Sequence, residues 1–307
     1  MIAMLTQMTP FFALIGVGYL AVRGGWLTPE AIAALTRFVF LFPLPALLFR
    51  FAADLSLAEV FTWRPVLAYL VGTGAVFALV FVVARRRGET LAPAAIEAQC
   101  AVTGNTGFLG LPLLIGVLGT AAVGPILMTL VLDIGVFATL VVVMITLSRQ
   151  ATLDRGLPGR ILRGWLGNPM VLSLTAGLVW AALGRDLWPP VDTSLALLAT
   201  AATPGALFAI GGSLAGAGGE RPAIAAWLGG AKLILHPLAV AAALWGAGVS
   251  GLVAQAMIAT AALPVAGNVY MLAQHYGIAP RRVSSAIFLS TLASLLTLGG
   301  VLAWGQT

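Results

Sequence analysis

Long apolar stretches alternate with short polar breaks along almost the whole chain. Each stretch holds about 20 residues, the length of helix that crosses the hydrocarbon core of a bilayer. The first five predicted spans cover residues 8–24, 32–53, 64–84, 94–118 and 121–147. The second five cover residues 165–184, 191–216, 222–247, 252–275 and 281–303. The pattern predicts an all-α polytopic membrane protein with ten transmembrane helices.

The longest polar stretch separates the fifth span from the sixth. We therefore expect a first five-helix repeat at residues 1–148, a cytoplasmic linker at 149–163 and a second five-helix repeat at 164–307. Three pairs of residues recur at one offset of 159 positions: Pro10 and Pro169, Pro45 and Pro204, and Asn105 and Pro264. Because five is an odd number, the second repeat must enter the membrane inverted. Inverted repeats are a transporter architecture, with the substrate site at the midplane where the repeats meet.

Spans four and nine contain the residues that interrupt helices. Span four has Gly104, Gly107, Gly110 and Pro112 within nine positions, and span nine has Pro264 and Gly267 near its centre. Proline removes a backbone donor and clashes with the preceding turn. Broken backbone at membrane depth must be buried in protein or line a cavity. We predict that these two helices are broken and cross, and that their freed N–H groups and half-helix N-termini bind an anion.

The predicted substrate-binding residues lie at the two breaks and in span eight. They are Asn105, Gly107, Pro112, Pro264, Asn268 and Lys232. An amide side chain can hydrogen-bond a carboxylate without the cost of burying a charge. The two asparagines could instead only satisfy freed backbone groups. Lys232 could balance the substrate carboxylate, or its long side chain could snorkel to the membrane interface.

Two ionisable residues inside the spans are the predicted ion-coupling groups, Asp133 and His236. A carboxylate in mid-span is costly, so Asp133 should face a cavity or a partner. It could carry a coupled proton or only make a structural hydrogen bond. His236 lies one helical turn from Lys232 and could titrate near neutral pH. The coupling ion could be H+ or Na+, and sodium is the more open alternative because unwound carbonyls can coordinate it.

Three other charged residues lie near predicted span ends. Glu97 opens span four, where a helix N-terminus favours its charge, so we expect it at the membrane interface. Arg50 and Asp54 are four positions apart, and we expect them to pair on one helix face.

The composition narrows the class of protein further. The chain is 60% hydrophobic and 8% charged, whereas soluble domains carry about 25% charged residues. The net charge of +6 lies in short loops, so it reports orientation and does not indicate nucleic-acid binding. Most loop arginines, including Arg85, Arg86 and Arg87, fall inside if the N-terminus is outside. We predict a multi-pass protein of the inner (plasma) membrane with both termini on the periplasmic side.

Several chemistries have no motif in this sequence. A single cysteine, Cys100, and two histidines give no basis for a disulfide or a metal site, and we expect no cofactor. There is no GxxxxGK[ST] run for ATP, no HExxH and no GxSxG. An ATP-driven pump, a zinc protease and a serine hydrolase are therefore not expected.

Five segments resemble one transporter family. GNTGFLGLPLL and ALPVAGNVYMLAQHYG are similar to the paired crossing helices of the auxin efflux carrier family, and LFPLPALLFRFA, GNPMVLSLTAGL and ATPGALFAIGGSLA resemble it as well. The resemblance covers essentially the whole chain and is closest to bacterial members of the malonate/malate-transporter-like type. It implies a rocking or elevator-like carrier with a carboxylate substrate. Relatives with this architecture are commonly dimers, so it also allows for a homodimer.

Together, these observations predict a secondary transporter of a small organic anion, a mono- or dicarboxylate that is auxin-like or malonate-like. Its partners would be this anion and membrane lipid. One alternative is an intramembrane enzyme acting on lipid or peptide, which needs a convergent pair of catalytic groups at one depth. Another is a ligand-sensing membrane receptor, which usually carries a soluble output domain.

Overall fold

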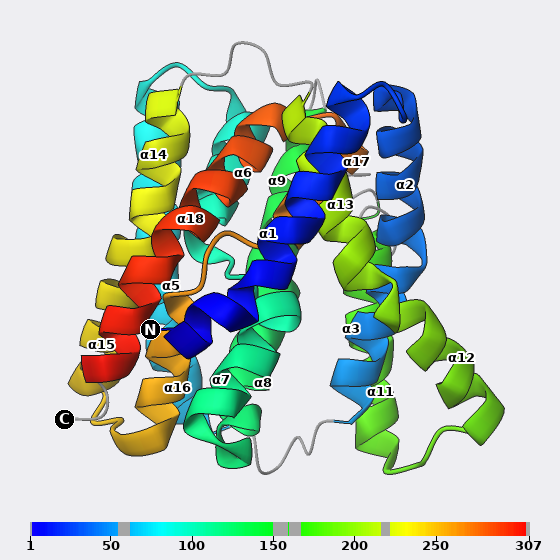
Figure 1. Ribbon diagram of the computed structural model, residues 1–307. Helices are drawn as coiled ribbons and strands as arrows, with labels where there is room; N and C mark the ends of the chain where they lie inside the picture. The colour runs from blue at the N-terminus through cyan, green and yellow to red at the C-terminus, as the bar shows by residue number, and fades with distance from the viewer. Residues whose placement is uncertain (1, 55–61, 150–158, 160–166, 216–221, 305–307) are drawn as a thin grey trace.

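The computed structural model describes residues 2–54, 62–149, 159, 167–215 and 222–304, and these residues are almost entirely helical. The first half contains α1 (Ile2–Arg23), α2 (Pro29–Leu41), α3 (Pro43–Ala53), α5 (Trp63–Arg86), α6 (Leu91–Val102), η1 (Thr106–Gly110), α7 (Leu111–Leu118), η2 (Thr120–Ala122), α8 (Val123–Leu132), η3 (Asp133–Ala138) and α9 (Thr139–Ser148). The second half contains α11 (Pro169–Leu183), α12 (Pro189–Thr200), α13 (Ala202–Ala215), α14 (Pro222–Gly230), η4 (Ala231–Leu235), α15 (His236–Gly246), α16 (Gly251–Ala261), α17 (Gly267–Tyr276) and α18 (Pro280–Trp304). Figure 1 shows most of these helices running between the top and the bottom of the molecule, with α1, α18 and α12 clearly tilted.

The all-helical membrane class is confirmed. Five helical segments of the described residues are long and apolar enough to cross a membrane: Pro29–Ala53, Trp63–Arg86, Thr120–Ser148, Pro189–Ala215 and Pro222–Gly246. Shorter apolar helices, such as Leu91–Val102 and Gly251–Ala261, end where the chain unwinds. The number of ten spans stays a prediction. Of the predicted linker, only Arg149 and Gly159 belong to the described residues.

The helices bend and end at corresponding points of the two halves. The junction between α2 and α3 is Phe42, and the junction between α12 and α13 is Ala201, 159 positions later. Helix α6 ends at Val102 and helix α16 ends at Ala261, again 159 positions apart. The offset that the prolines reveal in the sequence therefore also relates the places where the backbone changes direction.

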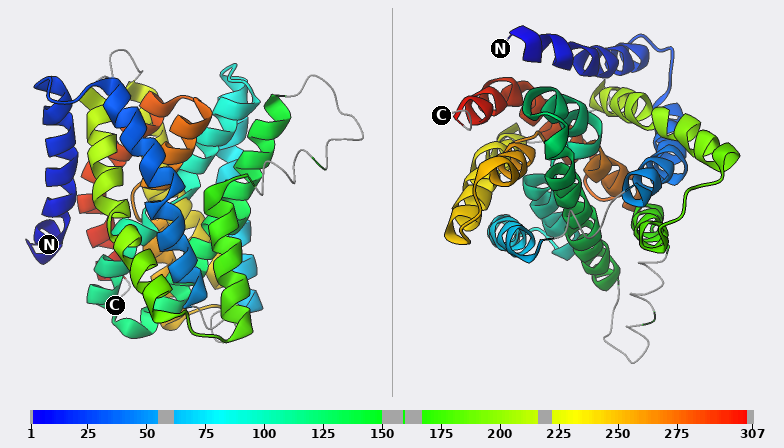
Figure 2. Two further views of the ribbon diagram at one scale, coloured as in Figure 1. Left: turned by 90° about the vertical axis from the view of Figure 1, so that its right-hand side faces the viewer. Right: turned by 90° about the horizontal axis from the view of Figure 1, so that it is seen from below.

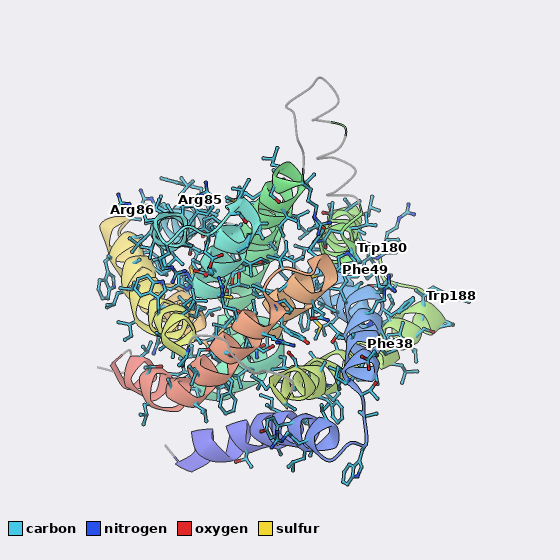
Figure 3. All side chains as sticks on the ribbon, turned by 90° about the horizontal axis from the view of Figure 1, so that it is seen from above. Phe38, Phe49, Arg85, Arg86, Trp180 and Trp188 are labelled. Carbon is cyan, nitrogen blue, oxygen red and sulfur yellow. The ribbon has the colours of Figure 1, made fainter. Side chains whose placement is uncertain are left out.

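The helices pack as two bundles, each drawing on both halves of the chain. In the first bundle, α1 and α2 pack on α13, and α3 packs on α11 and α12. In the second bundle, α5 packs on α6 and α15, and α14 packs on α18. Figure 3 shows Phe38, Phe49, Trp180 and Trp188 on the side of the first bundle, and Arg85 and Arg86 on the opposite side. The first bundle is joined further by Arg50, whose Nε donates to Asp192 Oδ1 at 2.8 Å. The partner of Arg50 in the structure is therefore Asp192 and not Asp54, the partner that the sequence predicted.

Helix α1 lies at the edge of the molecule and rests on α13 (Figure 2). Gly18 of α1 lies against the backbone of Phe208, and Gly211 of α13 lies against the backbone of Ile15. The two contacts show that the helices run antiparallel. Small residues at such a seam let helix backbones approach closely, which drives helix association where there is no water to expel.

We expect Gly18→Ala to destabilise this seam. The added methyl group would overlap the carbonyl of Phe208, which is backbone and cannot move aside like a side chain. Overpacking of this kind costs about 1–3 kcal/mol. Gly16→Ala, one half-turn away, is the matched control because its methyl group meets no atom within 4 Å. Thermal unfolding in detergent should show a lower Tm for Gly18→Ala only, and equal melting of both variants would contradict the packing.

Candidate substrate site

The chain unwinds twice near the centre of the molecule, and the two unwound segments pair with each other. Residues 103–105 separate α6 from η1, and residues 262–266 separate α16 from α17. Gly104 and Val265 form an antiparallel bridge. The N–H of Asn105 donates to the carbonyl of Pro264 at 2.8 Å, and the N–H of Ala266 donates to the carbonyl of Thr103 at 3.0 Å. Each break therefore satisfies backbone groups that the other leaves open.

A neighbouring helix completes this pairing. The N–H of Val265 donates to Ser290 Oγ of α18 at 3.1 Å, and Ser290 Oγ in turn donates to the carbonyl of Ile287 at 3.1 Å. Pro264 has no N–H to satisfy, so its ring causes no unpaired donor here. The carbonyl of Asn105 accepts from the N–H groups of Leu109 and Gly110. The site thus has a backbone that is held by hydrogen bonds although it is not helical.

The two breaks bring four helix ends together. Helices α6 and α16 end there, while η1 and α17 begin there. The starting ends carry partial positive charge and the finishing ends carry partial negative charge. Figure 1 shows the unwound segment between α16 and α17 passing through the middle of the molecule. An anion is favoured at the starting ends and a cation at the finishing ends.

A small cavity of about 20 Å³ lies at the starting ends. Three predicted substrate residues line it, namely Asn105, Gly107 and Asn268. Its other walls are Leu44, Leu47, Leu48 and Phe51 of α3, Gly104, Thr106, Leu130, Ile134 and Ala266. The cavity therefore lies between the two bundles. This volume admits about one water molecule, so the cavity is smaller than an organic anion.

Asn268 is 7% exposed, and its Oδ1 is buried without a hydrogen-bond partner among the described residues. A buried amide oxygen without a partner costs about 1–3 kcal/mol. Because the oxygen and nitrogen of an amide exchange places by a flip of the group, the same side chain can turn a donor to an anion. Asn268 is therefore the predicted residue whose unmet hydrogen-bonding capacity faces the cavity.

The remaining predicted substrate residues do not all lie on the cavity. Gly107 does, and a methyl group there would meet only Phe51 at an ordinary 3.6 Å. Pro264 contributes its carbonyl to the pairing with Asn105. Pro112 is the second residue of α7, and its side chain lies outside the described part of the structure. Lys232 lies at the other pair of helix ends.

A cluster of buried polar residues occupies that other side of the breaks. Tyr69 Oη of α5 donates to Asp133 Oδ1 at 2.7 Å. Lys232 Nζ lies 3.2 Å from His236 Nδ1 and donates to the carbonyl of Ala261, the last residue of α16. A methyl group on Gly104 would lie 3.4 Å from Lys232 Nζ, which places the ammonium directly at the break. Asp133 and Lys232 interact electrostatically across this space.

Lys232 is 0% exposed, so its side chain does not snorkel to the interface as one sequence alternative has it. The structure brings Asp133, Lys232 and His236 together, although they come from two spans. The sequence reasoning missed Tyr69 and Thr73 of α5. Thr73 Oγ1 lies 3.1 Å from His236 Nε2. Hydroxyl groups in mid-span were the available signal, but many such groups only bond to their own helix.

Two polar residues of the site lie on π-helical turns, and a third precedes one. Asp133 begins η3, Lys232 is the second residue of η4, and η1 follows Asn105 directly. A π-helical turn is rare and is frequent at functional sites. Within the described ranges, no three His, Cys, Asp or Glu side chains group to hold a metal ion.

Glu97 belongs to a charged cluster near one end of the molecule. Arg282 Nη1 donates to Glu97 Oε1 at 2.5 Å and to Glu89 Oε1 at 2.8 Å, while Arg87 donates to Glu97 Oε2. Glu97 is 1% exposed, so it is buried in this cluster and does not lie at an open interface. The cluster ties α6 to α18, the helix that also supports the break through Ser290.

We expect Ser290→Ala to weaken the paired breaks. The substitution leaves the N–H of Val265 buried without an acceptor, which costs about 1–3 kcal/mol. Ser294→Ala, one turn further along α18, removes only a bond from Ser294 Oγ to the carbonyl of Thr291 in the same helix. Thermal unfolding should therefore show a clearly lower Tm for Ser290→Ala than for Ser294→Ala. Equal values for the two variants would argue against support from α18.

Comparison with known proteins gives the family. A family model described as "Membrane transport protein" matches residues 3–302. The chain is 32% identical over 301 residues to a protein of Rhizobium meliloti (strain 1021) named "Putative malonate transporter", with 95% of this chain and 93% of that protein covered. Both findings concern transport, and neither describes an enzyme. The chain therefore belongs to the membrane transport protein family, the auxin efflux carrier family that its motifs resemble, and it is a multi-pass membrane transporter.

Proposed function

We propose that this transporter is a secondary carrier for a small organic anion and that malonate is the first candidate substrate. The observation that carries the proposal is the cavity that Asn105, Gly107 and Asn268 line at the paired breaks. It combines amide groups with two helix starts, and both favour a carboxylate. The name of the Rhizobium relative supports a dicarboxylate.

The architecture we propose is two inverted five-helix repeats that cross at the broken helices. Two antiparallel contacts and the opposite directions of the first and last helices support it. The bridge between Gly104 and Val265 is antiparallel. Gly72 of α5 lies against Ala239 and Val240 of α15, while Thr73 contacts His236, so these helices also run antiparallel. In Figure 1, α1 runs upward and α18 runs downward.

The orientation we propose places both termini on the periplasmic side of the inner membrane. The end of α5 and the starts of α6, α14 and α18 lie together at the top of Figure 1. Arg85 and Arg86 are in the last turn of α5, and Arg281 and Arg282 follow the first residue of α18. A concentration of arginines at one end indicates the cytoplasmic side.

A larger cavity of about 590 Å³ opens near the same end, between α2 and α17. Arg37, Gln274 and His275 are among its lining residues, and Phe40 and Met271 line it deeper along the two helices. The small cavity follows one turn further, at Leu44 and Asn268. We propose that this is the cytoplasmic vestibule, where the positive charge of Arg37 attracts the anion. Movement of one bundle against the other would then join the vestibule to the site.

The charged cluster behind the breaks gives the carrier its means of coupling. Lys232 interacts electrostatically with Asp133, so its positive charge becomes available to balance a bound carboxylate from across the breaks when Asp133 is protonated. Asp133 and His236 are the groups that could take up a coupled proton. Both ring nitrogens of His236 already have partners, in Thr73 and Lys232, so protonation of this ring must break one of these contacts. Among the described residues, Asp133 Oδ2 is buried without a hydrogen-bond partner, so Asp133 can take up a proton there without losing a contact.

We expect malonate to stabilise the purified protein. At a hundredfold excess over Kd, a ligand of the native state adds about 2.7 kcal/mol to the free energy of unfolding. Thermal unfolding against malonate, malate, succinate and indole-3-acetate should show a raised Tm for the substrate. Asn268→Ala should lose this shift. Asn168→Ala is the matched control, because Asn168 caps α11 through Met170 and Val171, contacts Tyr276 and does not line the small cavity.

The control should melt at a lower temperature but keep the full ligand shift. A shift that survives Asn105→Ala and Asn268→Ala would move the substrate away from the breaks. No shift with any of the acids would remove the anion assignment.

We expect Asp133→Asn to abolish the stimulation of malonate uptake by a pH gradient. An amide has the shape of the carboxylate but cannot take up the proton. Asp192→Asn is the control, since Asp192 lies partly exposed beside Arg50. Uptake into proteoliposomes, with and without an inward proton gradient, measures the effect. A gradient response that persists in Asp133→Asn would exclude this residue as the coupling group.

A further inference from the structure

The C-terminal end of α16 contacts a positively charged side chain of the protein, the ammonium group of Lys232. Helix α16 ends at Ala261, at the edge of the second break. The Ala261 carbonyl accepts a hydrogen bond from Lys232 Nζ. The neighbouring carbonyls of Ile258, Ala259 and Thr260 accept from N–H groups of Ala262 and Leu263. The lysine therefore satisfies the carbonyl that the chain leaves open where it turns away from the helix.

Such a position has the properties of a monovalent cation site. The end of a helix carries partial negative charge, and unwound carbonyls at broken transporter helices coordinate Na+. A primary ammonium carries the same single charge and presents three donors that point at oxygen or nitrogen acceptors. Lys232 Nζ uses the Ala261 carbonyl and His236 Nδ1, and it lies next to Gly104 of the other break.

The groups around the ammonium fix it there. His236 Nδ1 acts as the acceptor, so His236 Nε2 carries the hydrogen and donates to Thr73 Oγ1. Asp133, held by Tyr69, offsets the positive charge. All of these groups are buried, so water does not compete for the ammonium. The cluster is balanced in charge without an ion from solution.

We propose that Lys232 is the resident cation of this carrier and occupies the place that a coupled sodium ion would need. The consequence is a carrier that works without sodium. The sequence allows sodium coupling because unwound carbonyls can bind Na+. In the structure, however, Lys232 contacts the carbonyl at the end of α16 where such an ion would bind. The inference about transport rests on the proposed function, whereas the inference about sodium binding does not.

The test compares two variants that remove the charge in different ways. Lys232→Ala removes the charge and leaves space for an ion, whereas Lys232→Met removes the charge and fills the space. The wild type should melt at the same temperature in sodium chloride as in choline chloride, and it should bind no radioactive Na+. Lys232→Ala should gain stability in sodium chloride over choline chloride. Lys232→Met should show no such gain.

Malonate uptake into proteoliposomes completes the test. Wild-type uptake should be equal in sodium and choline media. Sodium-dependent uptake, binding of Na+ by the wild type, or a folded Lys232→Ala protein that ignores sodium would each overturn the inference. If Lys232→Ala does not fold, Na+ binding by the wild type decides alone. Absence of malonate uptake in both media would count against the proposed substrate, and the binding measurement would still judge the role of Lys232.

Discussion

The site depends on the pairing of two unwound segments through backbone hydrogen bonds. In lipid, an unpaired N–H or carbonyl costs several kcal/mol, so a broken helix survives only where protein supplies the missing partners. Here the breaks supply them to each other, through Asn105 with Pro264 and Ala266 with Thr103. Because of this pairing, side chains are not needed to satisfy these backbone N–H and carbonyl groups. Among the described residues, Asn268 keeps a buried amide oxygen without a hydrogen-bond partner, and it lines the small cavity.

The pairing also divides the site into one side with partial positive charge and one side with partial negative charge. Helix starts lie on one side with the small cavity, and helix ends lie on the other side with Lys232. In the carrier that we propose, the anion and the ammonium of Lys232 are attracted to different faces of the same paired backbone. Because the cavity also touches α3 of the first bundle, relative movement of the bundles changes the anion side directly. On the cation side, Tyr69 and His236 belong to α5 and α15 of the second bundle, whereas Asp133 begins η3, which also packs on α11 of the first bundle.

The sequence predicted what depends on local chemistry. Prolines at a fixed offset indicated the interrupted helices, because proline lacks the donor that a continuous helix needs. Apolar length indicated the membrane class, and the family motifs indicated a transporter. The sequence did not predict which side chains contact each other. Arg50 pairs with Asp192 across 142 positions, and Asp133 bonds to Tyr69 across 64. Such contacts depend on which helix faces are adjacent, and apolar spans have little periodicity to reveal their faces.

The small volume of the cavity has a consequence for measurements of the affinity of this carrier. A cavity that admits about one water molecule must widen before an organic anion can bind there. The apparent affinity then equals the intrinsic affinity reduced by the fraction of molecules that are open. If one molecule in a hundred is open, a substrate binds about a hundredfold more weakly than its contacts alone would give. Weak affinity would thus accompany good complementarity, and variants that loosen α3 against the breaks would bind the same substrate more tightly.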